Sequence, residues 1–287
     1  MRVAIMTDTN SGIMGREAEE LGIFSIPMPV IIEEETFFEG KNITEEEFYR
    51  ALGEGKRAST SLPSPKTVLD TWDFVLSQGY EEIVYIPMSS GLSNSCGAAA
   101  GMALDYEGKV FVVDNHRISI TLREAVLKAK RLADAGSSGS QIKRQLEKEA
   151  YDASIYIAVD TLEYLKKGGR ITPAAAMIGT VLHMKPILTI QGDKLDAYAK
   201  VRGMKKCQSC MLEAVSQDFE RRFAGKEHPQ MIAGVAGTCL PQDKVEEWKQ
   251  ALREVFPLAQ EVYYNALPIS IGCHVGPGAV GIGFCFR

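Results

Sequence analysis

The stretch IVYIPMSSGLSNSCGAAAGMAL, residues 83–104, contains the strongest local signal in the chain. Residues 83–86 form a short apolar run typical of a buried strand, and the Ala-rich segment that ends near Leu104 is typical of a helix. The polar residues between them follow a strand and open a helix. In a parallel α/β sheet, ligands bind at this carboxyl edge of the strands. The stretch therefore predicts both an α/β fold and a candidate ligand-binding loop.

The first half of the chain repeats this alternation of strand and helix. Residues 3–7 and 110–113 are typical of further buried strands, and residues 24–32 form another extended run. Two helix starts are clear, because Thr44 and Glu47 form a capping-box pattern and Ser64 precedes a proline. Strands that alternate with helices indicate a parallel sheet covered on both faces.

The second half has a different pattern. Its strands at 154–159, 231–235, 261–264 and 281–286 are accompanied by a hairpin pattern over 187–201. A small-residue helix is expected over 174–182. Adjacent strands with separate helices predict an α+β domain with a largely antiparallel sheet. We expect an N-terminal α/β/α domain at 1–151 and a C-terminal α+β domain at 152–287.

Composition limits the classes of function. The chain has 287 residues, which suggests about two domains, and 45% of them are hydrophobic. Its 32 basic and 37 acidic residues give a net charge of −5, which provides no general basic field for nucleic acid. No apolar stretch is long enough to span a membrane, and no signal peptide is recognisable, so a cytoplasmic location is expected. The six cysteines are then expected to be reduced, and Cys207-x-x-Cys210 lacks the second ligand pair of a zinc site.

Two clusters of hydroxyl groups are candidate anion sites. Ser90, Ser93, Asn94 and Ser95 surround a predicted helix N-terminus, whose unpaired N–H groups favour an anion. Capping of the helix by one serine is the competing interpretation. The other cluster is Thr60-Ser61-Leu62-Pro63-Ser64, which alone would be an ordinary loop, although its hydroxyls are suited to a carboxylate.

Two short basic segments are further candidates. Arg170 follows two lysines and two glycines, and capping of a helix C-terminus explains the lysines and Gly168 but not Arg170. The other segment contains Arg202, Lys205 and Lys206. In an acidic protein it suggests an acidic ligand or partner surface, while a solvated helix start remains an alternative.

His274 lies in a glycine-dense segment, which we expect to be a turn, between Gly272 and Gly276. Residues 276–281 formally match a dinucleotide-binding pattern, but only six residues follow, so no helix receives a pyrophosphate. The glycines instead allow close approach of the backbone to a ligand. His274 could donate to an anion, act as acid, base or nucleophile, or be a buried core histidine.

Asp8 follows the first strand, as does the nucleophile of haloacid-dehalogenase-type phosphatases. Asn10 stands where a second aspartate is expected, which argues against that chemistry. The chain also contains no P-loop, HExxH or GxSxG motif.

Taken together, these segments resemble the DegV family of bacterial fatty-acid-binding proteins. The matching segments run in family order over nearly the whole chain: Thr7-Asp8-Thr9, Thr60-Ser61-Leu62-Pro63-Ser64, Ser89-Ser90-Gly91-Leu92-Ser93, Leu165-Lys166-Lys167-Gly168-Gly169-Arg170-Ile171, Lys185-Pro186-Ile187-Leu188, residues 202–206, and Ile271-Gly272-x-His274-x-Gly276-Pro277-Gly278.

The resemblance implies a two-domain protein of the EDD fold that binds one long-chain fatty acid and needs no cofactor or metal. The carboxylate would lie at the domain junction, bound by Thr60 or Ser61, Ser93 and His274, and the acyl chain would enter the C-terminal domain. It also implies that a separate ATP-dependent, DAK-like fatty acid kinase subunit converts the bound acid to an acyl phosphate. Arg170 and Arg202 match positions linked to the head group and to the kinase, without a firm division between them.

The sequence departs from the family pattern in three places. Leu62 replaces a common glutamine, Asn94-Ser95-Cys96 replaces Gly-Thr-Tyr, and Gly203-Met204 interrupts a basic run. These changes affect ligand choice and partner affinity more than the fold.

Two other classes of function remain open at this stage. An enzyme that acts on a phosphorylated or carbonyl substrate would use His274 as nucleophile or base and Arg170 on the phosphate. A DNA-binding regulator is disfavoured by the net charge and by the lack of a recognition helix.

Overall fold

The computed structural model describes residues 2–177, 184–223 and 230–287, which divide into two compact units. The first unit contains Met1–Tyr151 and the short segment Pro268–Ser270. The second contains Asp152–Leu267 and Ile271–Arg287. The predicted fold class is confirmed, because one unit has a parallel sheet with helices and the other has a separate, mixed sheet.

A four-stranded sheet forms the centre of the first unit, and its strand order is β2-β1-β6-β7. All three pairings are parallel. The strands are β1 (Val3–Asp8), β2 (Ile23–Ile26), β6 (Glu82–Ile86) and β7 (Val110–Val112). The extended run predicted over residues 24–32 is in fact two strands in different sheets. Pro27 follows β2 and has no N–H to continue a ladder, and the chain then enters β3 (Pro29–Ile32).

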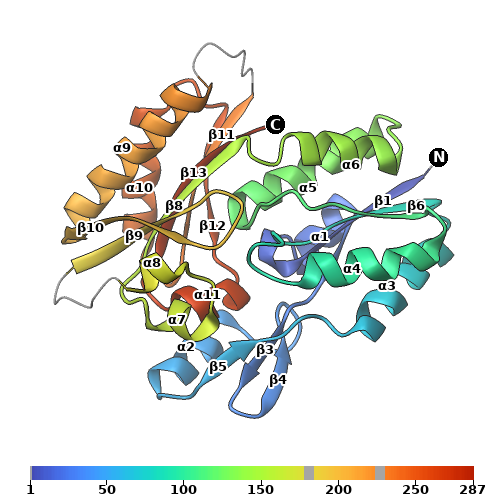
Figure 1. The fold of residues 1–287 in the computed structure, drawn as a ribbon, viewed down its shortest axis with the longest axis horizontal. Helices are drawn as coiled ribbons and strands as arrows, with labels where there is room; N and C mark the ends of the chain where they lie inside the picture. Colours follow the sequence, from blue (N-terminus) through green and yellow to red (C-terminus); the bar gives the residue numbers. More distant parts are fainter. Residues whose placement is uncertain (1, 178–183, 224–229) are drawn as a thin grey trace. The chain divides into compact units, whose positions relative to one another are not determined.

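Helices cover both faces of this parallel sheet (Figure 1). On one face, Trp72 and Val75 of α3 (Pro65–Ser77) and Ala99 of α4 (Ser95–Ala103) pack against alternate residues of β1 and β6, such as Met6 and Tyr85. Two other helices, α5 (Ser119–Asp134) and α6 (Gly139–Lys148), contact β1, β6 and β7. The helices of this unit are α1 (Gly15–Leu21), α2 (Glu45–Gly53), α3 (Pro65–Ser77), α4 (Ser95–Ala103), α5 (Ser119–Asp134) and α6 (Gly139–Lys148), with short 3₁₀ turns η1 (Thr9–Ser11) and η2 (Leu104–Tyr106).

A small antiparallel sheet in the first unit was not predicted. Its order is β4-β3-β5, with β4 at Glu35–Phe38 and β5 at Ala58–Thr60. These two strands are short and contain exposed polar residues, so they lack the apolar alternation by which strands are recognised. The predicted capping box of Thr44 and Glu47 does begin α2. Ser64 likewise caps α3, with Pro65 in its first turn.

The second unit is built on a six-stranded sheet with the order β10-β9-β8-β13-β11-β12. Among the strands that the structure describes here, only β11 and β12 pair in parallel, so the prediction of a largely antiparallel sheet is correct. The strands are β8 (Ala153–Ala158), β9 (Met184–Ile190), β10 (Asp196–Arg202), β11 (Met231–Gly237), β12 (Glu261–Ala266) and β13 (Val280–Phe286).

Two long helices, α9 (Met204–Phe223) and α10 (Gln242–Val255), pack with this sheet in a common hydrophobic core (Figure 1). Met211 and Val215 of α9, Trp248 of α10 and Phe284 of β13 belong to that core. Three shorter helices complete the described part of this unit: α7 (Glu163–Gly168), α8 (Pro173–Ala176) and α11 (Ile269–Val275), whose first two residues belong to the first unit. The small-residue helix predicted over 174–182 is described only to Met177, and its remainder lies outside the described residues.

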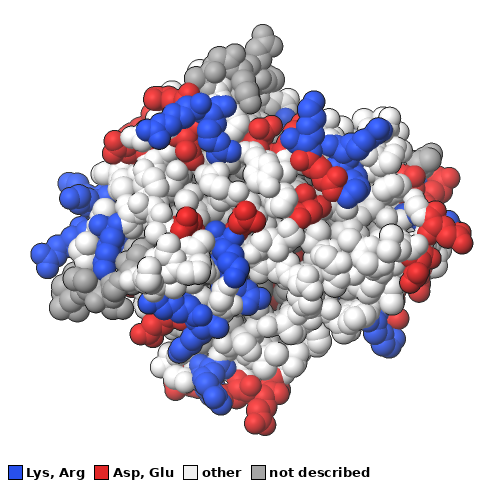
Figure 2. Space-filling model, in the orientation of Figure 1, with Lys and Arg blue, Asp and Glu red and all other residues white. Residues whose placement is uncertain are grey.

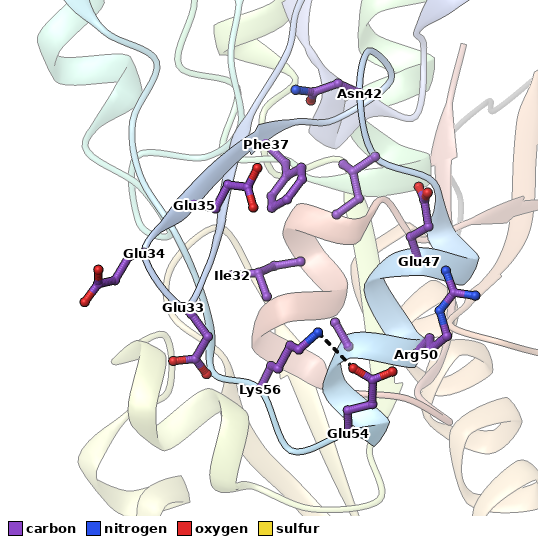
Figure 3. Close-up of a pocket in the computed structure, with 12 residues that line it drawn as sticks. Ile32, Glu33, Glu34, Glu35, Phe37, Asn42, Glu47, Arg50, Glu54 and Lys56 are labelled. Carbon is purple, nitrogen blue, oxygen red and sulfur yellow. Dashed lines mark ion pairs between the residues drawn. The ribbon is translucent and has the colours of Figure 1, made fainter.

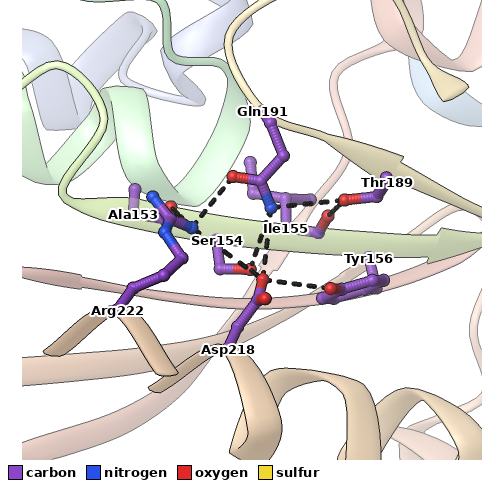
Figure 4. A network of polar contacts seen from close by, with 8 residues as sticks. All are labelled: Ala153, Ser154, Ile155, Tyr156, Thr189, Gln191, Asp218 and Arg222. Carbon is purple, nitrogen blue, oxygen red and sulfur yellow. Dashed lines mark hydrogen bonds and ion pairs between the residues drawn. The ribbon is translucent and has the colours of Figure 1, made fainter. Parts of the chain in front are cut away.

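A polar network joins α9 to the sheet of the second unit (Figure 4). Asp218 Oδ2 accepts hydrogen bonds from Ser154 Oγ at 2.5 Å and from Tyr156 Oη at 3.0 Å. Gln191 Nε2 donates to the same oxygen at 3.2 Å, and Arg222 Nη1 forms an ion pair with it at 3.8 Å. One carboxylate oxygen therefore collects donors from two strand regions and from its own helix.

No helix of the described ranges is long and apolar enough to cross a membrane. Over the same ranges, no cluster of three or more His, Cys, Asp or Glu side chains could hold a metal ion. Basic and acidic side chains are interspersed over the face drawn in Figure 2.

Candidate ligand-binding site

The serine-rich loop lies between β6 and α4, as the sequence predicts. Ser93 is buried, and its Oγ accepts the backbone N–H of Ser95 at 3.2 Å and lies 3.0 Å from Ser95 Oγ. Ser93 therefore satisfies the first N–H of α4, but the N-cap residue is Asn94, whose side chain makes no capping hydrogen bond, so the competing interpretation of a serine cap is wrong. A hydroxyl has two acceptor sites and one hydrogen, so Ser93 can still donate to a ligand if Ser95 Oγ donates to Ser93 Oγ. Ser90 and Asn94 are exposed, and the Ser90 N–H points to Asp114 Oδ1.

The second hydroxyl cluster ends the small sheet of the same unit. Thr60 is the last residue of β5 and is opposite Val30 of β3. Ser61 is exposed, and its backbone N–H donates to Pro29 O at 3.3 Å. Within the described part of the chain, its hydroxyl contacts only the carbonyl of the next residue, Leu62. Pairing with β3 thus fixes the backbone of Thr60 and Ser61, while the Ser61 side chain remains directed by a weak local bond.

Arg170 and His274 meet in the second unit. The C-terminal end of α7 approaches the imidazole so closely that a Cβ at Gly168 would lie 2.3 Å from His274 Nδ1. Arg170 donates from Nη1 to the carbonyl oxygen of Gly168. Gly169 ends α7 with φ +69°, a conformation that glycine adopts without strain. The two glycines therefore have separate uses, one conformational and one steric.

The local environment keeps His274 neutral at physiological pH. Burial, and to a smaller extent the positive charge of Arg170, lower its pKa to about 4. The neighbouring Cys273 is also buried, which raises the pKa of its thiol to about 12. A neutral imidazole has one N–H donor and one acceptor, whereas an imidazolium has two donors and a charge. His274 is thus suited to donate one hydrogen bond to an anion.

The predicted turn around His274 is wrong, because His274 lies in helix α11, one residue before its end. Gly272 lies within that helix, and its carbonyl accepts the N–H of Gly276 at 2.8 Å. Gly276 has φ +76°, and a Cβ there would lie 2.5 Å from the Tyr164 ring. The chain then enters strand β13, which agrees with the rejection of a dinucleotide-binding motif.

Arg202, Lys205 and Lys206 lie together at the end of β10 and in the first turn of α9. All three are exposed, and none forms an ion pair with another described residue. Cations in a first helical turn oppose the helix dipole. Helix stability therefore does not explain the two lysines, which favours an interaction with an acidic group outside the chain.

A cavity of about 650 Å³ lies elsewhere in the first unit, beside the small sheet and α2 (Figure 3). None of the predicted site residues lines it. It has an apolar part that includes Ile32 and Phe37, and the cations Arg50 and Lys56 also line it. Five carboxylates line it as well: Glu33, Glu34, Glu35, Glu47 and Glu54. This acidic surplus disfavours a carboxylate ligand there.

Sequence reasoning missed a group of buried polar residues near the serine loop. Asp8, at the end of β1, accepts the backbone N–H of Met88 at 3.0 Å. Glu39 is 3% exposed and contacts Thr9 and Ser270. The sequence singles out the segment Thr7-Asp8-Thr9. No local pattern predicts burial of the glutamate between Phe38 and Gly40.

Comparisons with known proteins agree with the fold and with the expected family. The model of the DegV family, a family described as uncharacterised proteins, matches residues 2–287. A DegV domain-containing protein of Deinococcus radiodurans is 31% identical over 98% of both chains. Another from Streptomyces coelicolor is 32% identical over 98% of this chain and 97% of its own.

Two solved structures cover the whole of this chain and are covered completely by it. One is a DegV family protein from Thermus thermophilus described as binding fatty acid, with a TM-score of 0.89 and 28% identity. The other is DegV from Bacillus subtilis, described as a fatty acid binding protein, with a TM-score of 0.85 and 28% identity. The fold and these matches define a two-unit protein of a class that includes solved proteins described as binding fatty acids. The chain belongs to the DegV family.

Proposed function

We propose that this protein binds a long-chain fatty acid and acts as its carrier, without catalytic activity of its own. The observation that carries the proposal is the match over the whole chain to solved DegV proteins that bind fatty acids. In the proposal, Thr60, Ser61 and Ser93 of the first unit and His274 of the second donate hydrogen bonds to the carboxylate. Ser90, Asn94, Gly272 and Gly276 shape the backbone around it.

The chemistry of His274 supports this assignment. Because its pKa is lowered to about 4, it offers a neutral N–H at physiological pH. Neutral donors can orient a carboxylate without the large desolvation cost of a second buried charge. Arg170 lies beside His274 and supplies the nearby positive charge. The head group would thus be held mainly by directed hydrogen bonds.

Apolar burial would supply most of the affinity. Transferring roughly fourteen methylenes from water at about 0.8 kcal/mol each gives about 11 kcal/mol before the costs of ordering. A hydrogen bond at the head group contributes about 1 kcal/mol net. In the proposal the acyl chain enters the second unit near the small residues Ala174, Ala175 and Ala176 of α8.

The finer part of the proposal concerns a partner. We propose that a separate ATP-dependent, DAK-like fatty acid kinase receives the bound acid and forms an acyl phosphate from it. Arg202, Lys205 and Lys206 are exposed and lack ion-pair partners among the described residues, so they are available to an acidic surface. The proposed setting for this exchange is the cytoplasm.

Native mass spectrometry tests the ligand. Protein purified from a bacterial host is expected to show an added mass equal to a fatty acid, and stripped protein is expected to rebind palmitate. Ser93→Ala should weaken binding by roughly threefold to tenfold, since it removes one hydrogen bond. Ser77→Ala, on the surface of α3, is the matched control. A protein that is always empty and does not take up palmitate contradicts the proposal.

Arg202→Ala separates the two parts of the proposal. It should leave palmitate affinity unchanged and reduce phosphorylation of the bound acid by the kinase. Arg144→Ala, on the exposed face of α6, controls for the loss of one surface charge. Turnover of a phosphorylated or carbonyl substrate by the isolated chain, lost in His274→Ala, would instead support the enzyme alternative.

A further inference from the structure

Two buried carboxyl groups lie at opposite ends of one hydrogen-bonded chain in the first unit. Asp8 ends β1, Asn10 lies in the 3₁₀ turn after it, Glu39 follows β4, and Ser270 belongs to the short segment that returns to this unit. Each of these four residues is at most 3% exposed. The fatty-acid assignment uses neither carboxyl group.

Three contacts connect the two carboxyls in sequence. The Asn10 side chain lies 2.9 Å from Asp8 Oδ1. Its other end lies 3.0 Å from Ser270 Oγ. Ser270 Oγ in turn lies 2.7 Å from Glu39 Oε2. All three are ordinary hydrogen-bond distances, and each needs one hydrogen between its two heavy atoms.

These three contacts need one more hydrogen than Asn10 and Ser270 provide. The Asn10 amide can donate at one end only, because its other end is a carbonyl oxygen, and Ser270 has a single hydroxyl hydrogen. With Asn10 donating to Asp8, Ser270 must donate to Asn10, so the third hydrogen comes from Glu39. With the amide reversed, Ser270 donates to Glu39, and Asp8 must then supply the hydrogen. Either way, one carboxyl is protonated.

The orientation of Asn10 decides which carboxyl holds the proton. In this structure Asn10 Nδ2 donates to Asp8 Oδ1, which also accepts the backbone N–H of Asn10 at 3.0 Å. Met88 N–H donates to the other Asp8 oxygen. Three N–H donors therefore face Asp8 and favour its ionised form. We propose that Asp8 and Glu39 share one excess proton, which resides on Glu39 and is donated to Ser270 Oγ.

The surroundings of the two carboxyls agree with a neutral Glu39. Glu39 also accepts hydrogen bonds from the Thr9 hydroxyl at 2.6 Å, from the backbone N–H of Ser270 at 3.2 Å and from the backbone of Ile269. Burial raises the pKa of both Glu39 and Asp8. The charge of Asp8 acts on Tyr85 and Cys96, and burial raises the pKa of both, so both stay uncharged at pH 7.

The proton has a consequence for ligand binding, which rests on the proposed function. Asp8 holds the N–H of Met88, immediately before the serine loop. Glu39 holds Ser270, in the first turn of the helix that bears His274. Glu39 is therefore a positioning residue. Its proton completes the series of hydrogen bonds from Asp8 to Glu39, which holds the segments at Met88 and Ser270.

Isotope-edited infrared spectroscopy of the full chain at pH 7 tests the protonation. With ¹³C-labelled glutamate, the folded protein is expected to show the C=O band of a protonated carboxyl, which an ionised carboxylate lacks. Glu39→Gln should remove this band, and Glu35→Gln, at an exposed position of β4, should leave it. Absence of the band in the unaltered protein, or its persistence in Glu39→Gln, overturns the proposal.

Palmitate binding tests the positioning role separately. Glu39→Gln, a neutral isostere, should change affinity by less than about twofold, whereas Glu39→Ala should lower it by roughly tenfold. A similar loss in both variants would show that the carboxyl acts as an ion and overturns the proposal. If the unaltered protein binds no palmitate but shows the infrared band, the proposed function fails and the proton assignment stands.

Discussion

Each unit contains a carboxyl group that is removed from bulk water, and the two units compensate this burial in different ways. In the second unit, Asp218 is paired with Arg222 and accepts hydrogen bonds from Ser154, Tyr156 and Gln191 (Figure 4). In the first unit, Asp8 and Glu39 accept from hydroxyl, amide and backbone N–H groups, with no ion pair to either among the described residues.

The difference shows how burial and charge are balanced. Asp218 keeps an 18% exposed side chain and a cation, so its ionised form is compensated by Coulomb attraction and by water. Glu39 is almost fully enclosed and has no such partner, so a proton takes the place of a cation. Asp218 and its donors thus form a charged carboxyl site, and Glu39 with its hydrogen-bond partners forms a neutral carboxyl site.

Truncation of Glu39 is expected to have the largest effect on this comparison. Glu39→Ala leaves the Thr9 hydroxyl and the Ser270 N–H without their acceptor in a dry site and creates a void, which should cost about 4 kcal/mol. Urea unfolding followed by Trp72 fluorescence, in a Trp248→Phe background, reports on the first unit alone because Trp72 is its only tryptophan. A loss below about 1 kcal/mol would mean that water or neighbouring groups replace the carboxyl.

Asp218→Ala is expected to have the next largest effect, confined to the second unit. It removes the acceptor of three donors, but the partial exposure of Asp218 lets water replace some of these bonds, so we expect a loss of about 2 kcal/mol. Trp248 fluorescence in a Trp72→Phe background measures it. Asp243→Ala, in the first turn of α10, is the matched control. An equal change in both tryptophan signals would show that the two units do not unfold separately.

Much of the fold was predictable because its signals are local. Buried strands such as β6 are continuous apolar runs, and caps such as Thr44 with Glu47 act over three residues. The small sheet was missed because β4 and β5 are held by pairing with β3, not by their own apolar pattern. Pairing between distant segments leaves little trace in a short polar strand.

The residues of the candidate site were predictable, but the distant contacts that position them were not. The residue types near His274 indicated anion binding, but the requirement for glycine at Gly168 depends on an imidazole far away in the sequence. The burial of Glu39 likewise depends on Ser270, from near the opposite end of the chain. Such needs become visible only when the contacts are known.

The pH dependence of stability distinguishes the charged carboxyl site from the neutral one, with a smaller effect. Burial raises the pKa of Glu39 above its ordinary value of 4.5, so over the window between the two values the folded state holds a proton that the unfolded state has lost. The contribution of Glu39 to stability should therefore decrease as pH rises through this window, by at most about 1.4 kcal/mol per pH unit. Stability of the first unit in the unaltered protein minus that in Glu39→Gln isolates this slope. A difference that grows in favour of the unaltered protein as pH rises would contradict it.

The most delicate test replaces each carboxyl by its amide. At Glu39 the amide N–H can donate to Ser270 Oγ as the acid does, so Glu39→Gln should change the stability of the first unit by less than about 0.5 kcal/mol. At Asp218 the amide removes the charge opposite Arg222 and must find room for two hydrogens among groups that already donate, so Asp218→Asn should cost the second unit about 1 kcal/mol. Measured by the single-tryptophan variants in urea, the two costs are compared within one protein. Equal losses of stability would mean that both carboxyls carry the same charge. The distinction between a charged and a neutral carboxyl site would then be wrong.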